Sequence, residues 1–144
     1  MPRFTGLAFA LALAALAICS TASVASAAAV APAPPDHLTL TVTDSGDPAA
    51  DGTFELSCHP AGGTHPAAQA ACDRLDALTT WGTDLFAPVR PDSMCTMQYG
   101  GPATAHVTGT WAGRPVDASF RRTDGCEIAR WDDFAPLLPA TTGA

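Results

Sequence analysis

The sequence predicts a small α+β domain of antiparallel strands with helical segments, stabilised by disulfides. Several segments alternate apolar and polar residues with a period of two, which is typical of half-buried strands. One segment repeats apolar residues at helical spacing. The cysteine count becomes even once an N-terminal targeting segment is removed, and the 144 residues fit a single small domain.

The N-terminus has the features of a secretory signal peptide. An apolar run over residues 7–18 follows Arg3 and leads into small residues that end in Ala25-Ser26-Ala27. The run is short for a membrane span, and Ile18 does not suit a lipoprotein site at Cys19. We therefore expect cleavage after residue 27 and a secreted, extracellular protein.

The charge of the chain excludes some classes of partner. It has 14 Asp and Glu residues against 7 Lys and Arg, and all seven basic residues are Arg. A net charge of -7 gives no counterion-release term for binding phosphates. We expect no nucleic-acid partner and no membrane partner.

Residues 28–35 contain only Ala and Pro apart from Val30, which predicts an extended, disordered leader. Folded structure is expected from Asp36 onward. The predicted organisation is therefore a signal peptide at 1–27, a leader at 28–35 and one domain at 36–144.

Two strands open the predicted domain. Residues 37–43 and 53–58 alternate apolar and polar side chains. The turn-forming residues 44–52 between them predict an antiparallel pair.

A helix is expected next, with Thr64 as its N-cap and Pro66 in its first turn. Four positions at i, i+3, i+4 and i+7 would face the sheet: Ala68, Ala71, Cys72 and Leu75. Prolines in residues 82–92 then disfavour a helix or a central strand.

The second half of the domain predicts a hairpin. Residues 105–111 and 116–120 are its strands, and Trp111 is the largest expected core residue. Residues 127–131 are expected to form one helical turn before a Pro-rich, frayed end.

Four mature cysteines allow three disulfide pairings. Local geometry favours Cys58 with Cys72, because a strand end and the facing side of the next helix meet readily, and this leaves Cys95 with Cys126. A zinc site from Cys58, His59, His65 and Cys72 is the alternative, but it lacks the usual ligand spacing. We expect no metal and no cofactor.

Familiar catalytic motifs are absent from the sequence, so we expect no enzyme. The segment 94–99 has two interpretations. Met94 and Met97 could fill gaps in the core, as methionines commonly do. Alternatively, a disulfide through Cys95 could hold an extended, exposed loop that imitates a protease substrate.

Three segments carry a family resemblance: residues 63–68 leading to Cys72, residues 94–99, and residues 107–113, with Cys126-Glu127 in the place of a fourth cysteine. They resemble the Streptomyces subtilisin inhibitor-like proteins over about residues 38–127. The resemblance implies a five-stranded antiparallel sheet with two helices, the disulfides Cys58 with Cys72 and Cys95 with Cys126, and a homodimer.

The resemblance also implies a function. Met97 would be the primary specificity residue, and Met97–Gln98 the bond offered to a subtilisin-like serine protease. Met94, Cys95, Thr96 and Tyr99 would complete the protease-binding segment. Three features depart from the family pattern: Gln98 where an aliphatic residue is expected, two extra residues between Cys72 and Cys95, and the chain after Glu127.

A second hypothesis is a secreted structural or crosslinking partner, such as a transglutaminase substrate. Gln69 and Gln98 are the only glutamines, and the chain has no Lys to act as the amine. It could therefore serve as an acyl donor only.

Overall fold

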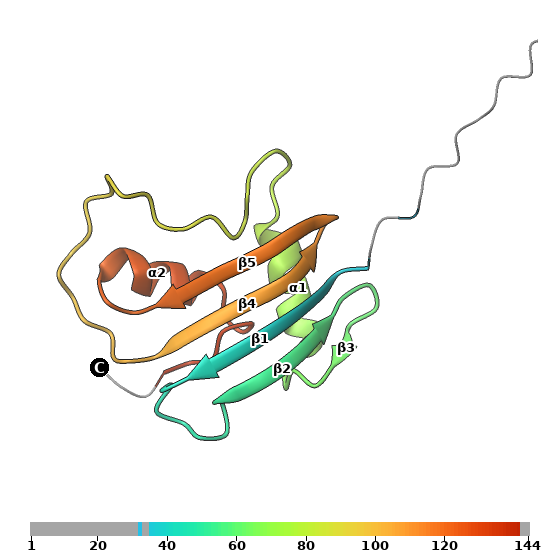
Figure 1. Cartoon of the computed structure of the whole chain (residues 1–144), viewed down its shortest axis with the longest axis horizontal. Coiled ribbons are helices and arrows are strands. Elements are labelled where there is room, and N and C mark those ends of the chain that lie inside the picture. The colour runs from blue at the N-terminus through green and yellow to red at the C-terminus, as the bar shows by residue number, and fades with distance from the viewer. Residues whose placement is uncertain (1–31, 33–34, 142–144) are drawn as a thin grey trace, which may run out of the picture. The chain divides into compact units, whose positions relative to one another are not determined.

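The sheet has five antiparallel strands in the order β3-β2-β1-β4-β5, and two helices complete the fold (Figure 1). A computed structural model describes residues 32 and 35–141, so the predicted signal peptide and most of the predicted leader lie outside the described residues. The elements are β1 (His37–Thr43), β2 (Gly52–Ser57), β3 (Gly62–Gly63), α1 (Ala68–Leu78), β4 (Thr104–Trp111), β5 (Arg114–Arg121) and α2 (Gly125–Asp133). The expected α+β class, with five strands and two helices, is confirmed. No helix within the described ranges is long and apolar enough to cross a membrane.

Strand β1 lies at the centre of the sheet, and its side chains alternate between a buried and a more exposed face. Leu38, Leu40 and Val42 are buried, and the residues between them are not. Leu40 pairs with Phe54 of β2 on one side and with Val107 of β4 on the other. The period of two predicted for these strands therefore places a continuous apolar face on one side of the sheet.

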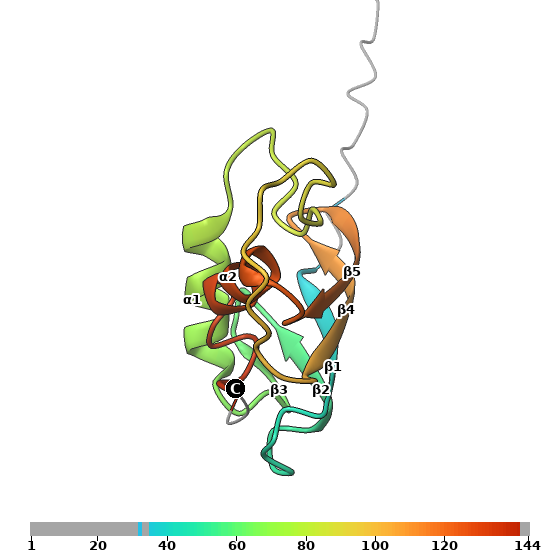
Figure 2. The same ribbon diagram turned by 90° about the vertical axis from the view of Figure 1, so that its left-hand side faces the viewer.

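Both helices cover this apolar face, as the edge-on view of the sheet shows (Figure 2). Helix α1 buries Ala71, Cys72 and Leu75, so the predicted helix face is confirmed. The disulfide between Cys58 and Cys72 joins the end of β2 to this face, as the local geometry favoured.

The predicted start of the first helix is wrong. Helix α1 begins at Ala68, and its N-cap Ala67 makes no side-chain capping bond. The Thr64 hydroxyl instead accepts a hydrogen bond from the Glu55 N–H at 2.8 Å. Thr64 is therefore used to close the β2–β3 turn, and Pro66 lies in the turn before the helix.

The predicted single helical turn at residues 127–131 is also too short. Helix α2 has nine residues. It begins before the expected start because Asp124 caps it by accepting hydrogen bonds from the N–H groups of Cys126 and Glu127. An Asp at the N-cap satisfies amide groups that otherwise have no partner within the helix.

The frayed C-terminal end expected after this helix is wrong as well. Phe134, Leu137 and Leu138 are buried, and Trp131, at 1% exposure, is more deeply buried than Trp111. The Trp131 indole donates to the Pro139 carbonyl at 2.9 Å. Apolar residues spaced three or four apart therefore continue the packing of α2 after the helix itself has ended.

Buried His65 fixes this C-terminal segment to the rest of the domain. Its Nε2 donates to the Leu137 carbonyl at 3.0 Å, and its Nδ1 accepts from the Ala67 N–H at 3.2 Å. The carbonyl can only accept and the amide can only donate, so the two contacts define a neutral imidazole with its proton on Nε2.

Candidate functional site

The exposed large apolar side chains gather on one loop. Met94 is 100% exposed, Met97 is 99% exposed and Tyr99 is 61% exposed. All three lie between α1 and β4, in a segment with no helix or strand. The interpretation of Met94 and Met97 as core residues is therefore wrong, and the loop is exposed. Trp81, at 98% exposure, lies on the earlier part of the same connection.

The N-terminal half of this loop is fixed to the start of α2. Cys95 forms a disulfide with Cys126, with a Cα–Cα distance of 5.2 Å, and this is the expected second pairing. The Thr96 carbonyl accepts a hydrogen bond from the Gly125 N–H at 3.0 Å. A Cβ at position 125 would overlap the Thr96 hydroxyl, so this close approach requires a glycine.

The C-terminal half of the loop is fixed by Arg122. The Gly100 N–H donates to the Arg122 carbonyl at 2.8 Å, and the Gly100 carbonyl accepts from Arg122 Nε at 3.0 Å. Gly100 is buried against Ile128, whose Cγ1 atom would lie 2.8 Å from a Cβ at this position. A side chain at residue 100 would therefore push the loop away from α2.

The guanidinium of Arg122 is itself held in place. Its Nη1 donates to the Asp132 carboxylate at 2.7 Å, and its Cζ lies 5.8 Å from the centre of the Trp131 ring. The Arg122 side chain is only 12% exposed, so these contacts are partly shielded from water. Partial burial makes a hydrogen bond between charged groups stronger than the same pair at an open surface.

The segment between these two anchors has free main-chain groups. Among the described residues, none forms a hydrogen bond with the main chain of Met97 or Gln98. An extended backbone with unused N–H and C=O groups can pair with the edge of another protein's strand. The main-chain groups of Met97 and Gln98 are therefore free to form hydrogen bonds outside the described residues.

Helix α2, which carries Gly125 and Cys126 and contacts Arg122 through Asp132, is attached to the sheet by Arg130. This side chain donates to the carbonyls of Ser119 and Phe86 at 2.8 and 2.9 Å, and its Cζ lies 4.0 Å from the centre of the Phe120 ring. Burial lowers the pKa of Arg130, and the Glu127 carboxylate opposes this shift. The contacts hold the support of the loop rigidly on β5.

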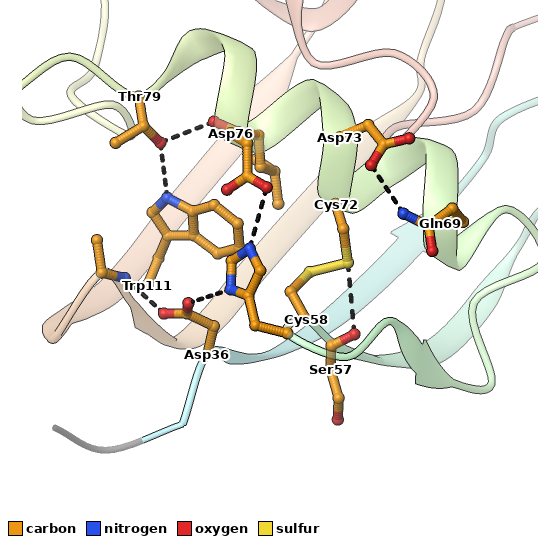
Figure 3. A network of polar contacts seen from close by, with 12 residues as sticks. Asp36, Ser57, Cys58, Gln69, Cys72, Asp73, Asp76, Thr79 and Trp111 are labelled. Carbon is orange, nitrogen blue, oxygen red and sulfur yellow. Dashed lines mark hydrogen bonds and ion pairs between the residues drawn. A yellow bond between two sulfur atoms is a disulfide. The ribbon is translucent and has the colours of Figure 1, made fainter. Parts of the chain in front are cut away.

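A second polar network includes Asp36 and Asp76 (Figure 3). Both carboxylates bond to the ring of His59. His59 Nδ1 is 2.9 Å from Asp36 and Nε2 is 3.0 Å from Asp76, and Asp36 also accepts from the Ala112 N–H at 2.6 Å. The hydrogen bonds to Asp76 and then Asp36 raise the pKa of His59. This network ties β1, α1 and the β4–β5 turn together.

The zinc set considered as an alternative does not form in this fold. Cys58 and Cys72 are joined to each other, so neither sulfur is a thiolate. His65 lies in the core, where its ring contacts Leu137 and Ala67. Cys95, Asp124 and Cys126 lie close together, but their two sulfurs also form a disulfide.

Every residue of the predicted protease-binding segment lies on this one loop: Met94, Cys95, Thr96, Met97, Gln98 and Tyr99. Arg122 and Gly125, which support the loop, are absent from that set. A helix N-cap at Asp124 is recognisable from residue type, and it would have located the start of α2. No local pattern links Arg122 to Gly100, because the two are brought together only by the fold.

Comparison with known proteins agrees with this arrangement. The model of the family described as subtilisin inhibitor-like matches residues 34–123. The chain is 42% identical over 102 residues to a probable subtilase-type protease inhibitor of Streptomyces avermitilis, covering 67% of this chain and 66% of that protein. It is 36% identical over 97 residues to subtilisin inhibitor-like protein 1 of Streptomyces cacaoi, covering 65% of this chain and 84% of that protein.

Among solved structures, the chain is similar to Streptomyces caespitosus sermetstatin, crystallised in complex with Bacillus licheniformis subtilisin. The identity is 33%, the TM-score is 0.41, and the match covers 67% of this chain and 91% of that chain. The family match extends from residue 34 through β5 and includes the exposed loop. This chain is a member of the subtilisin inhibitor-like family.

Proposed function

We propose that this protein inhibits subtilisin-like serine proteases by presenting Met97–Gln98 as a substrate-like bond. The observation that carries the proposal is an almost fully exposed Met97 on a loop anchored on both sides. Membership of the subtilisin inhibitor-like family and the inhibitor names of the relatives support it.

The loop would bind as an added strand in the protease cleft. Residues 94–96 would pair with the enzyme through main-chain hydrogen bonds, and the Met97 side chain would enter the specificity pocket. Because Cys95 and Thr96 are already fixed to α2, binding orders little additional chain. A preorganised loop loses less conformational entropy and so binds more tightly for the same contact area.

The side chain at residue 97 selects the class of protease. Met is apolar and unbranched at Cβ, which suits a broad hydrophobic pocket. A trypsin-like enzyme would need a basic residue at this position, and Arg90, although largely exposed, lies seven positions before Met97. We therefore propose a subtilisin-like enzyme as the partner.

The protein would inhibit the protease rather than be consumed as a substrate, because the chain on both sides of the Met97–Gln98 bond is held in place after cleavage. The protease serine hydroxyl attacks the Met97 carbonyl carbon, the C–N bond breaks, and the Gln98 amine takes a proton from the protease histidine. Water can then hydrolyse the acyl ester to a Met97 carboxylate. Alternatively, the Gln98 amine attacks the ester, the peptide bond forms again and the serine hydroxyl is released.

Secretion and dimerisation belong to the same proposal. The signal peptide predicted at residues 1–27 and the two disulfides support an extracellular location, where thiols become oxidised. The homodimer is supported by the resemblance to the family. Light scattering on the purified mature chain measures it: a mass of one protomer across micromolar concentrations would exclude the dimer.

The experiment that tests the proposal is a titration of subtilisin with the purified mature protein. Protease activity should fall linearly to near zero close to an equimolar ratio. Undiminished activity with rapid cleavage of the chain would refute inhibition. That second outcome would favour the crosslinking hypothesis, because Gln98 is exposed, whereas the Gln69 side chain donates to Asp73 at 2.8 Å.

A further inference from the structure

The segment that runs from the end of β5 into the first turn of α2 holds both sides of the proposed scissile bond. On the acyl side, Cys126 and Gly125 fix Cys95 and Thr96. On the other side, Arg122 makes two hydrogen bonds to Gly100, two residues after Gln98. One short segment, residues 122–126, is thus the common support of two chain segments that cleavage would separate.

The two anchors differ in chemistry. The acyl side is held by a covalent bond, which cleavage of Met97–Gln98 leaves intact. On the amine side no disulfide lies near the bond, and the position of the chain depends on the hydrogen bonds of Gly100. Whether the Gln98 amine stays beside the acyl carbon is therefore decided by noncovalent contacts.

We propose that Arg122 is a positioning residue that keeps the Gln98 amine in place for resynthesis of the bond, an inference that rests on the proposed function. Its guanidinium reaches the Gly100 carbonyl through Nε and the Asp132 carboxylate through Nη1 at the same time. This uses the fixed fork of donors that arginine has and lysine lacks. The guanidinium lies over the Trp131 ring, and this contact helps to fix the orientation of Nε toward the Gly100 carbonyl.

The consequence is a high effective concentration of the amine. A group held beside the ester reacts as an intramolecular partner, and it competes with water far better than a free amine would. Loss of the Arg122 side chain would leave Gly100 only its main-chain hydrogen bond to the residue 122 carbonyl, so the segment after residue 98 would move more and hydrolysis would gain over resynthesis. Arg122 would never touch the reacting atoms, since it acts through Gly100.

The test compares Arg122→Ala with a matched control, Arg114→Ala. Both changes remove one positive charge from β5 or its end, but Arg114 begins the strand and Arg122 follows its last residue. Each protein is incubated with a catalytic amount of subtilisin, and mass spectrometry follows the gain of one water at Met97–Gln98. Thermal unfolding is measured alongside.

Arg122→Ala should accumulate the cleaved form about ten times faster than the wild type, since a hydrogen bond from a charged donor is lost. Its cleaved form, isolated and returned to subtilisin, should re-form less intact chain. Arg114→Ala should behave as the wild type. Equal partition between cleavage and resynthesis in the two variants would overturn the role of Arg122.

Two further outcomes separate the possible failures. If the wild type does not inhibit subtilisin at all, the proposed function is wrong and this inference falls with it. If Arg122→Ala fails to fold, Arg122→Lys carries the test, because it keeps a charge opposite Asp132 but has no rigid second donor for Gly100. Arg122→Lys should give intermediate cleavage, and wild-type resistance would overturn the role of the forked geometry.

Discussion

The Thr96 carbonyl accepts a hydrogen bond from the Gly125 N–H at 3.0 Å, and the Thr96 side chain occupies the space next to the missing Cβ of Gly125. Residue 96 directly precedes Met97, so this contact sets the path of the backbone at the proposed scissile bond. A side chain at residue 125 would therefore change the loop without entering the core.

The first prediction concerns Gly125→Ala. The new methyl group would collide with the Thr96 hydroxyl and move the loop. Inhibition of subtilisin should weaken about tenfold, because the hydrogen bond between the Gly125 N–H and the Thr96 carbonyl is lost and the loop no longer has the geometry that the protease binds. Stability should not fall greatly, because Ala favours a helix over Gly by about 1 kcal/mol. The measurements are an inhibition constant and a melting temperature.

Gly62→Ala is the control for this change, because a Cβ there meets no atom within 4 Å. The double change Gly125→Ala with Thr96→Ala should recover part of the lost inhibition, since it removes the colliding hydroxyl. If Gly125→Ala alone inhibits as well as the wild type, the close contact does not set the loop geometry.

The second prediction separates the two disulfides. Replacing Cys95 and Cys126 by Ser should lower the free energy of unfolding by about 3.7 kcal/mol, and replacing Cys58 and Cys72 by about 3 kcal/mol, from loop-closure entropy. Both pairs thus cost similar stability. Only the first change should convert the protein into a substrate that subtilisin cleaves quickly, because only Cys95 lies on the loop.

Denaturant titration gives the two stabilities, and electrophoresis after incubation with subtilisin gives the cleavage. The Cys58 and Cys72 variant serves as the control for loss of a covalent link. Equally fast cleavage of both variants at Met97–Gln98, at a temperature where both are folded, would show that the position of the disulfide does not matter.

The third prediction concerns pH and His59. The contacts with Asp76 and Asp36 raise its pKa in the folded state above the ordinary value of 6.5. The protonated form is therefore stabilised by folding. Its contribution is fully present below about pH 6.5 and is lost as the pH rises through the raised folded value.

His59→Asn tests this sign, because Asn tolerates the positive φ of 59° at this position. The melting temperature of the wild type should exceed that of the variant by more at pH 5.5 than at pH 9. Taking this difference cancels the titration of the groups that do not contact His59. A gap that widens with rising pH would show that the neutral ring is the form that folding favours.

The fourth prediction concerns the C-terminal segment. Leu137 is fully buried, so Leu137→Ala should lower the free energy of unfolding by roughly 3 kcal/mol, as expected for a cavity in a packed core. Ala140→Ser is a nearby control at an exposed position. A cost below about 0.5 kcal/mol for Leu137→Ala would mean that the segment frays, as its composition suggested.

These results show which parts of the fold could be predicted. The alternation of apolar and polar residues over 37–43 could be predicted, because it depends only on neighbouring positions along one strand. The prolines and glycines around Met97 favoured an exposed loop, but the sequence also allowed Met97 to fill a gap in the core. The burial of Leu137 could not be predicted, because it depends on His65, 72 residues earlier in the chain. Arg122 was missed for the same reason, since Gly100 is brought to it by the sheet and α2.

The most direct test of the account is Met97→Asp. Met97 is 99% exposed, so the change should leave the melting temperature within about 3 °C of the wild type. A carboxylate in an apolar specificity pocket is strongly disfavoured, so inhibition of subtilisin should be lost at equimolar ratio, whereas Met97→Leu should retain it. Full inhibition by the folded Met97→Asp protein would contradict the assignment of Met97–Gln98 as the bond presented to the protease.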